Sequence, residues 1–240
     1  MVDIHSHILY GIDDGCKDIN ESIKILKKYE QDGIKHVILT PHYINNGEYN
    51  TCNNEKIKLF NELNKKVKEE NIKINIYLGN EIYITKDIIS LLENNKIMGI
   101  NNSKYLLIEF PIFDDNKQIL NLIHNIVLSG YIPIIAHPER YIYVQKDINI
   151  LNEYINLGAL LQINKDSFFG KYGKGPKKAV KKIIKKQLAT FIGTDIHSID
   201  SEFYSNDKLK KTIKRFSNKK YAEELLELNG LKLLTKGDLN

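Results

Sequence analysis

Seven short apolar segments, rich in β-branched residues, alternate along this chain with segments of helical periodicity. The apolar segments span residues 2–7, 35–40, 72–78, 105–110, 132–136, 159–163 and 190–193. Alternation of this kind predicts parallel strands joined by crossover helices. No linker or low-complexity segment interrupts the pattern, so we predict a single α/β domain over residues 1–240.

The segments between and after the strands carry the signals of amphipathic helices. Asp18, with Glu21 three residues later, is a typical helix N-cap, and Gly33 ends the first helix. Further helices are expected around residues 56–70, 86–93, 117–128, 148–157, 176–186, 208–215 and 220–228. Segment 176–186 alternates pairs of lysines with pairs of apolar residues, which indicates a helix with one solvated face rather than a binding site.

Polar side chains stand at the carboxyl end of nearly every predicted strand. His5 and His7 occupy alternate positions of the first strand, so they face the same side. A carboxylate inside an apolar run, as at Glu109, is costly to bury unless it is paired or bound to a metal. The full candidate set is His5, His7, Asp14, His42, Glu81, Glu109, His137, Asp195 and His197. Any one of them alone has an ordinary structural explanation, whereas their joint placement favours a common metal site.

This candidate ligand set bears on both the metal and the fold. Imidazoles and carboxylates without thiolates suit Mn²⁺, Fe²⁺ or Zn²⁺. Nine ligands are too many for one ion, so two or three ions are expected. Seven strands leave open a closed barrel or an open doubly wound sheet. The ligands favour a TIM-like (β/α)7 barrel, because the loops after all strands of a barrel gather at one face.

Motifs of other catalytic classes are missing from the sequence. Neither Cys16 nor Cys52 begins a Cys-x5-Arg phosphate loop, and no Gly-x-Ser-x-Gly elbow or P-loop is present. The glycine-rich segment 170–175 lacks the spacing of a phosphate-binding loop. The basic residues are almost all lysines and form no stripe of arginines and aromatics, which argues against a nucleic-acid partner.

Localisation signals favour the cytoplasm. Two cysteines provide no disulfide framework and suit a reducing cytosol. The first residues show no basic segment followed by an apolar one, as a signal peptide would. No apolar run approaches the ~20 residues needed to span a bilayer. We therefore expect a cytoplasmic protein without direct membrane insertion.

Six motifs follow the predicted strands in a specific order. They are Asp3-Ile-His-Ser-His7, Gly11-Ile-Asp-Asp-Gly15, Thr40-Pro-His42, Ile108-Glu-Phe-Pro111, Ala136-His-Pro-Glu-Arg-Tyr141 and Asp195-Ile-His197. Together they resemble the polymerase-and-histidinol-phosphatase (PHP) superfamily. More narrowly, the chain is similar to its bacterial protein-tyrosine phosphatases of capsular and exopolysaccharide operons, from Val2 to about His197. Gln162, Asn164, Ser167 and Gly170 also resemble residues of that subfamily.

The resemblance implies a distorted (β/α)7 barrel, the PHP fold, with three metal ions that are usually manganese. One ion would be held by His5, His7, Glu81 and Asp195. The second would be held by Glu109, His137 and the bridging Glu81. The third would be held by Asp14, His42 and His197. The residues expected to take part in catalysis are Arg140, Asp195 and His197.

The resemblance gives Arg140 the role of gripping the substrate phosphate. An arginine can make a two-point contact to phosphate oxygens that a lysine cannot copy. The structural alternative is a surface ion pair between Arg140 and Glu139. Tyr10 and Asn80 differ from the residues expected beside the site, which affects the fit of the substrate more than metal binding.

We therefore expect a metal-dependent phosphotyrosine-protein phosphatase, in which a metal-activated water attacks phosphorus in line. The expected partner is the phosphotyrosine-bearing tail of a tyrosine kinase that regulates polysaccharide export and is membrane-associated through its own adaptor. Two alternatives stay open: a small-molecule phosphatase, such as a histidinol-phosphate phosphatase, and a non-catalytic metal-binding domain. The complete ligand set and Arg140 argue against the non-catalytic alternative.

Overall fold

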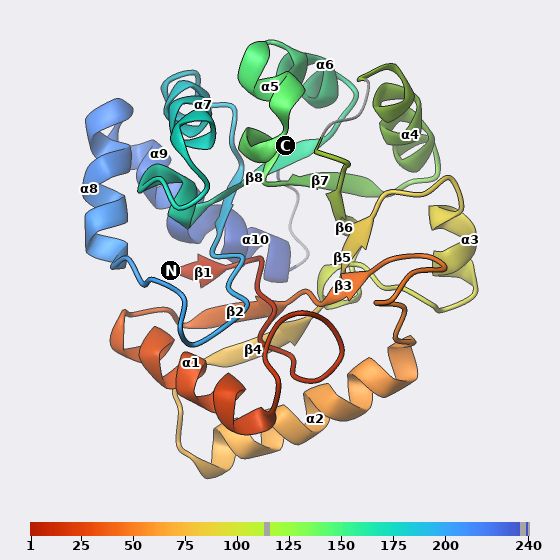
Figure 1. Ribbon diagram of the computed structural model, residues 1–240, viewed down its shortest axis with the longest axis vertical. Coiled ribbons are helices and arrows are strands. Elements are labelled where there is room, and N and C mark those ends of the chain that lie inside the picture. The colour runs from red at the N-terminus through yellow and green to blue at the C-terminus, as the bar shows by residue number, and fades with distance from the viewer. Residues whose placement is uncertain (113–115, 236–238, 240) are drawn as a thin grey trace.

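The computed structural model describes residues 1–112, 116–235 and 239 as parallel strands surrounded by helices (Figure 1). One sheet has the order β1–β2–β4, and a second has the order β3–β5–β6–β7–β8–β9. Every pair of neighbouring strands is parallel. The strand bounds are β1 Val2–Asp3, β2 His36–Leu39, β3 His42–Tyr43, β4 Asn75–Leu78, β5 Glu81–Tyr83, β6 Tyr105–Glu109, β7 Ile132–Ala136, β8 Leu160–Asn164 and β9 Phe191–Gly193.

The helices lie outside the strands, and each predicted helix is present. Their bounds are α1 Ile19–Gln31, α2 Asn53–Glu69, α3 Ile88–Glu93, α4 Asn116–Leu128, α5 Ile142–Lys146, α6 Ile150–Asn156, α7 Lys174–Lys185, α8 Asn206–Phe216, α9 Lys219–Glu223 and α10 Asn229–Leu234. Short 3₁₀ turns add η1 Ile100–Asn102, η2 Pro138–Arg140 and η3 Lys165–Phe168, and a π-helical turn adds η4 Glu224–Leu228. Asp18 caps α1 as predicted, accepting hydrogen bonds from the amides of Asn20 and Glu21.

All seven predicted strands are present, although β1 ends at Asp3, before His5 and His7, and two further short strands, β3 and β5, are added. The sequence analysis ended the second and third strands before His42 and Glu81, whereas those residues begin β3 and β5. Pro41 cannot donate a ladder hydrogen bond, so β2 stops before it. Its carbonyl oxygen nevertheless accepts from the Glu81 amide at 3.1 Å and from Asn80 Nδ2 at 3.2 Å, and parallel pairing resumes directly afterwards.

Backbone hydrogen bonds also join the segments that follow β1 and β9. The Asp195 amide donates to the His5 carbonyl and the His7 amide donates to the Ile196 carbonyl, both at 2.9 Å. Ser6 and Ile196 form an isolated parallel bridge. No single sheet closes on itself within the described residues, but the two sheets together surround a common centre (Figure 1).

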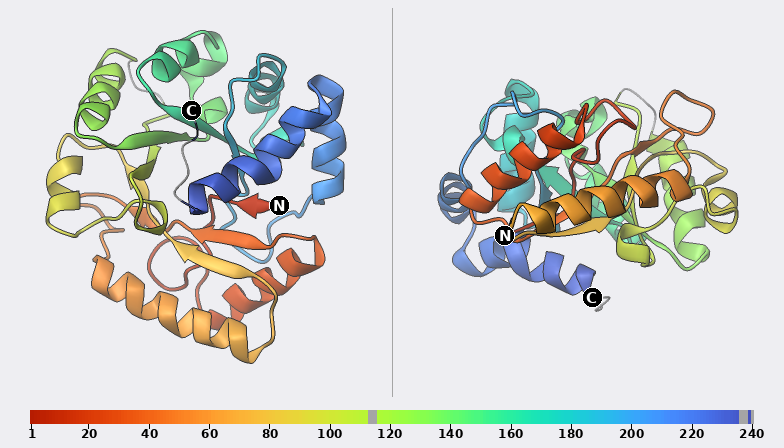
Figure 2. Two further views of the ribbon diagram at one scale, coloured as in Figure 1. Left: turned by 180° about the vertical axis from the view of Figure 1, so that it is seen from behind. Right: turned by 90° about the horizontal axis from the view of Figure 1, so that it is seen from below.

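The C-terminal segment formed by η4 and α10 lies against the amino ends of β1 and β9. Seen from behind in Figure 2, α10 crosses close to β1. A Cβ atom at Gly230 would lie 2.6 Å from Val2 Cβ, so only glycine permits this approach. The opposite face, where the strands end, is left to the loops that carry the candidate ligands. Across the described ranges, no helix combines the length and apolar character needed to cross a bilayer.

Candidate metal centre

The structure gathers the predicted polar residues at the carboxyl ends of the strands, in three overlapping groups that could hold metal ions. The first group is His5, His7, Glu81 and Asp195; the second is His7, Asp14, His42 and His197; the third is His42, Glu81 and Glu109. His137 lies against the third group. Residues separated by up to about 190 positions therefore meet at one place, as the carboxyl ends of parallel strands allow.

The first group is buried and tightly packed. Nε2 of His5 lies 3.1 Å from Glu81 Oε2 and 3.5 Å from Asp195 Oδ1. Nε2 of His7 lies 3.2 and 3.4 Å from the same two oxygens, and 3.2 Å from Nε2 of His5. Four potential ligand atoms thus face one point, which is the grouping that the sequence resemblance implied for one ion.

The other ring nitrogen of each histidine fixes its tautomer. Nδ1 of His5 donates to Gln162 Oε1 and Nδ1 of His7 donates to Asp13 Oδ2, both at 2.8 Å. Because carbonyl and carboxylate oxygens only accept, the proton of each neutral ring sits on Nδ1. When both rings are neutral, the two Nε2 lone pairs face each other, an arrangement that a cation between them would stabilise.

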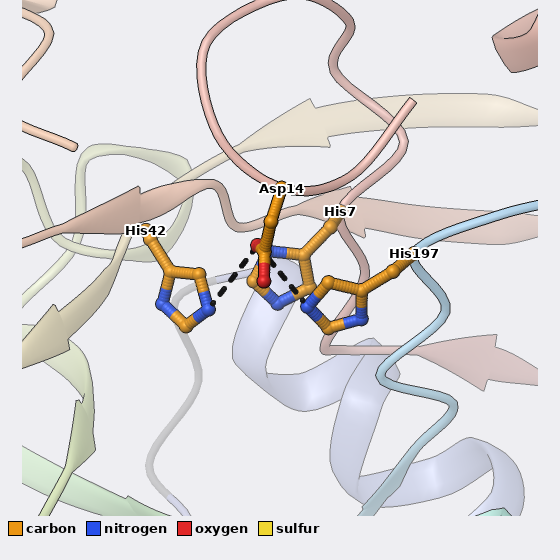
Figure 3. A group of neighbouring side chains, drawn as sticks. All are labelled: His7, Asp14, His42 and His197. Atoms are coloured by element: carbon orange, nitrogen blue, oxygen red, sulfur yellow. Dashed lines mark ion pairs between the residues drawn. The ribbon is translucent and has the colours of Figure 1, made fainter. Parts of the chain in front are cut away.

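The second group lies at the mouth of the site and is partly exposed (Figure 3). Asp14 Oδ1 lies 3.7 Å from His42 Nε2 and 3.5 Å from His197 Nε2. The His7 ring stacks on the His197 ring, with centroids 3.9 Å apart. The resemblance placed His7 with one ion only, whereas the structure places it in both the first and second groups.

The third group is organised by Glu81, whose two oxygens face different neighbours. Oε1 lies 3.0 Å from Nε2 of His137, while Oε2 lies 3.2 Å from Nδ1 of His42. Glu109 Oε1 lies 3.7 Å from Nε2 of His137. The structure therefore brings His137 to both carboxylates that the resemblance assigned to it, and adds His42 to them.

Unsatisfied polar atoms indicate that the residues present fit bound cations. Glu81 Oε2 and His42 Nδ1, which face each other at 3.2 Å, are buried without a hydrogen bond. Buried polar groups are otherwise almost always paired, because an unpaired one costs about 1–3 kcal/mol. Imidazole and carboxylate donors around a carboxylate whose two oxygens face different histidines suit two neighbouring divalent ions.

The buried charges perturb one another. Burial opposes the charged form of His5, but the Glu81 and Asp195 carboxylates outweigh it and raise the pKa of His5 to about 9. Burial and the Glu81 carboxylate raise the pKa of Glu109 to about 8. The protons on His5 and Glu109 balance the negative charge of Glu81 and Asp195, and a bound cation would replace those protons.

Two of the strand-end residues have left-handed backbone conformations. His137 has φ 32° and Asp195 has φ 54°, which non-glycine residues rarely adopt. Such strain persists where the surrounding structure fixes the residue, and it is frequent at functional sites. The conformation turns both side chains toward Glu81 and His5 directly after their strands.

Arg140 contacts the first group rather than the protein surface. Its Nη1 donates to Asp195 Oδ2 at 3.0 Å, and its side chain is 25% exposed. The alternative ion pair with Glu139 is wrong, because Glu139 is fully buried and its carboxylate bonds to other residues. Glu139 Oε1 instead accepts from Ser167 Oγ at 2.6 Å and from the Asn164 amide at 2.9 Å.

Sequence reasoning missed the residues that orient the ligands. Asp13 contacts His7 and also accepts from the His42 amide at 3.0 Å, yet in the sequence it is merely the neighbour of Asp14. Gln162 was noted only as part of the resemblance, and its contact with His5 was not foreseen. The pair Asp13-Asp14 was the available signal, but sequence alone cannot say which carboxylate faces His7.

Tyr10 and Asn80 differ in their distance from the ligands. Tyr10 points outward, and its hydroxyl donates to Glu62 Oε2 at 2.8 Å. Asn80 is buried beside Glu81, and its Oδ1 accepts from the buried Lys56 Nζ at 2.6 Å. Lys56 and Asn80 thus hold the turn from which Glu81 projects.

Comparison with known proteins places this geometry in a family. The family model for capsular polysaccharide synthesis, CpsB/CapC, matches residues 1–235. CapC of Staphylococcus aureus is 41% identical over 225 residues, which cover 94% of this chain and 87% of CapC. The tyrosine-protein phosphatase CpsB of Streptococcus pneumoniae is 32% identical over 240 residues, covering 98% of each chain.

Solved structures agree with the sequence relatives. A crystal structure from a study of YwqE of Bacillus subtilis and CpsB of Streptococcus pneumoniae, described there as metal-dependent tyrosine phosphatases, superposes with a TM-score of 0.92 at 29% identity. The match covers 100% of this chain and 96% of that one. A histidinol phosphate phosphatase from Lactococcus lactis has a TM-score of 0.60 at 17% identity, covering 90% of this chain and 94% of that one, which shows a shared fold. The chain therefore belongs to the CpsB/CapC family of capsular polysaccharide synthesis.

Proposed function

We propose that this protein is a metal-dependent protein-tyrosine phosphatase. The observation that carries the proposal is the buried quartet of His5, His7, Glu81 and Asp195, with Arg140 bound to the outer oxygen of Asp195. A cation site and a fixed guanidinium side by side suit a phosphoryl group, which carries charge on several oxygens. The names of the relatives CpsB and YwqE support the same activity.

We assign the ions by the groups of ligand atoms. The first ion would lie among His5, His7, Glu81 and Asp195, and the second would share Glu81 with Glu109 and His137. The third would lie among Asp14, His42 and His197, beside His7. Two or three ions per chain are proposed, with manganese as the expected metal and Fe²⁺ or Zn²⁺ as alternatives for this donor set.

The side chains have separate roles in this proposal. When bound, ions of this type activate a water molecule for attack on phosphorus and neutralise charge on the phosphoryl group. Asp13 and Gln162 hold the first two histidines in the tautomer that leaves Nε2 free. His197 donates from Nδ1 to the Asp195 carbonyl at 3.0 Å, which directs its Nε2 toward Asp14. Arg140 orients the phosphoryl oxygens through its remaining N–H groups.

We also propose that residues 1–240 form one distorted (β/α)7 barrel. The Asp195 amide donates to the His5 carbonyl and the His7 amide donates to the Ile196 carbonyl, which joins the segments after β1 and β9. In a barrel the first and last strands are neighbours, which explains why His5 and His7 lie beside Asp195.

The proposed substrate is the phosphotyrosine-bearing tail of a tyrosine kinase of capsule synthesis. Membership of the capsular polysaccharide family supports a kinase partner. The kinase would be membrane-associated through its own adaptor, and this protein would meet it from the cytoplasm, which the small number of cysteines suits.

Substrate competition tests the proposed function. Protein loaded with Mn²⁺ is incubated with a phosphotyrosine peptide, the matched phosphoserine peptide and histidinol phosphate, and released phosphate is measured. We expect the highest kcat/KM on the phosphotyrosine peptide, and none in excess chelator. Preference for histidinol phosphate would show a small-molecule phosphatase instead. Absence of turnover with bound metal would show a non-catalytic metal-binding domain.

A further inference from the structure

The glycine-rich segment 170–175, which follows η3 and ends in the first turn of α7, has a structure that the proposed reaction does not by itself require. Gly170 and Gly173 both have φ 97°, and the Gly173 amide donates to the Gly170 carbonyl at 2.9 Å. A side chain at Gly173 would meet no atom within 4 Å, so its backbone conformation, and not lack of space, explains the glycine. The two glycines close a tight turn with Lys171 and Tyr172 at its tip.

This turn is fastened to η3 by one residue. The carbonyl of Asp166 accepts from the amides of Gly170 at 3.1 Å and Lys171 at 3.3 Å. The Asp166 carboxylate also pairs with Lys171 Nζ at 2.9 Å. Tyr172 is therefore presented from a fixed support and not from a free loop.

The Tyr172 ring lies against the guanidinium of Arg140. Arg140 Cζ is 4.7 Å from the ring centroid, a distance at which a cation and an aromatic face attract. The same guanidinium donates through Nη1 to Asp195 Oδ2 at 3.0 Å. In the part of the chain that the structure describes, its other N–H groups have no hydrogen-bond acceptor. The carboxylate and the ring thus hold the guanidinium while leaving donors for a ligand.

Gln145 of α5, which lies against Gly175, supports the backbone of Arg140. Gln145 Nε2 donates to the carbonyl oxygens of Glu139 and Arg140, each at 3.0 Å. A Cβ atom at Gly175 would overlap with Oε1 of Gln145. Glycine at position 175 therefore gives Gln145 the space in which it holds this turn of backbone.

We propose that Tyr172 is a positioning residue for Arg140, and that segment 170–175 exists to fix the arginine for phosphate binding. The inference rests on the proposed function, because it takes the phosphoryl group as the ligand of Arg140. An arginine side chain has many rotamers in solution, and holding its planar group in advance reduces the entropy lost when a phosphate binds. The aromatic ring, and not the hydroxyl group of Tyr172, supplies this support.

A double-mutant cycle tests the proposal in the full-length protein loaded with Mn²⁺. Tyr172→Leu, Tyr172→Phe and Gly175→Ala are made in the wild type and in Arg140→Ala. The measurements are kcat and KM on a phosphotyrosine peptide and the dissociation constant of inorganic phosphate by calorimetry. Tyr131→Leu, which removes a half-buried tyrosine before β7 at the opposite end of the strands, and Lys174→Ala, next to Gly175, serve as controls.

We expect Tyr172→Leu to lower kcat/KM and weaken phosphate binding about tenfold, with metal content and melting temperature unchanged. Tyr172→Phe should stay within about twofold of the wild type, because it keeps the ring. Gly175→Ala should lower kcat/KM as Tyr172→Leu does. In Arg140→Ala, neither Tyr172→Leu nor Gly175→Ala should have a further effect.

Equal losses from Tyr172→Leu with and without Arg140 would overturn the proposal, since the tyrosine would then act independently. Failure of Tyr172→Phe to retain activity would also overturn it. If the wild type hydrolyses no phosphotyrosine peptide, the proposed function fails, and the phosphate titrations alone decide the role of Tyr172.

Discussion

Arg140 donates a hydrogen bond to Asp195 across 3.0 Å, and this contact joins the two halves of the candidate site. The other oxygen of the same carboxylate faces the His5 and His7 rings, at 3.5 and 3.4 Å. A second donor, Asn164 Nδ2, lies 2.6 Å from the oxygen that Arg140 contacts. One carboxylate thus links the proposed phosphate-binding arginine to the proposed metal ligands.

Replacing Arg140 by alanine should separate phosphate binding from metal binding. Arg140→Ala should keep its metal and its fold, but kcat/KM should fall by about two orders of magnitude, because a charge-assisted contact contributes about 1.5–3 kcal/mol. Arg140→Lys should recover little, since a point charge cannot reproduce the planar guanidinium. Elemental analysis and phosphotyrosine-peptide kinetics measure both effects. Wild-type turnover in Arg140→Ala would mean that the metals alone hold the phosphate.

Removing the charge of Glu81 should remove metal and activity together. Glu81→Gln keeps the size of the side chain but makes one of its two engaged oxygens a weakly binding amide nitrogen, so metal content and turnover should both fall by at least about tenfold. Glu93→Gln, at the end of α3, is the matched control. Elemental analysis after purification without chelator gives the metal content. A variant that kept a full metal complement would contradict the shared role of this carboxylate.

Metal binding should release protons near neutral pH. Before a cation binds, the pKa of His5 is raised to about 9 by Glu81 and Asp195 against the effect of burial, and that of Glu109 is raised to about 8 by burial and Glu81. Both groups carry a proton at pH 7, and a ligand must lose it, so metal affinity should increase as pH rises to about 9. Calorimetric titration with Mn²⁺ in buffers of different ionisation enthalpy counts the protons. A heat that is independent of the buffer would rule this out.

Lys56 should make stability increase with pH. Burial lowers its pKa to about 7, against an ordinary value of about 10.5. Between these values the unfolded chain holds a proton that the folded chain lacks, so the free energy of unfolding rises with pH by up to about 1.4 kcal/mol per unit. Lys56→Met removes this dependence. Urea unfolding of both proteins in chelator at several pH values between about 7 and 10 tests it, and parallel profiles would refute it.

The cysteines should be dispensable for turnover. Burial raises the pKa of the Cys16 thiol to about 12, so it is protonated at neutral pH and a poor nucleophile. Cys52 is exposed and precedes α2. The variant with Cys16→Ala and Cys52→Ser should retain activity within about threefold, provided that it remains folded by melting temperature. Loss of turnover from either change in a folded protein would contradict the metal mechanism and indicate thiol chemistry instead.

The sequence by itself determined the order of the elements. Apolar β-branched runs and helical periodicity are local properties, so all seven strands and the predicted helices, including α1 with its Asp18 cap, could be predicted from short windows. It also indicated that the polar residues would meet, because parallel strands place all their carboxyl ends on the same side. The family motifs then suggested how the ligands divide among ions.

Tertiary structure decided the contacts between distant residues. Arg140 pairs with Asp195, 55 positions away, and not with its neighbour Glu139. Asp13, and not Asp14, accepts the hydrogen bond from Nδ1 of His7, and His7 belongs to two groups of potential ligands. The extra strands β3 and β5 formed because Asn80 and Glu81 bond to the carbonyl of Pro41. Each outcome depends on side-chain direction and distance across strands, which no local pattern contains and only the assembled strand ends fix.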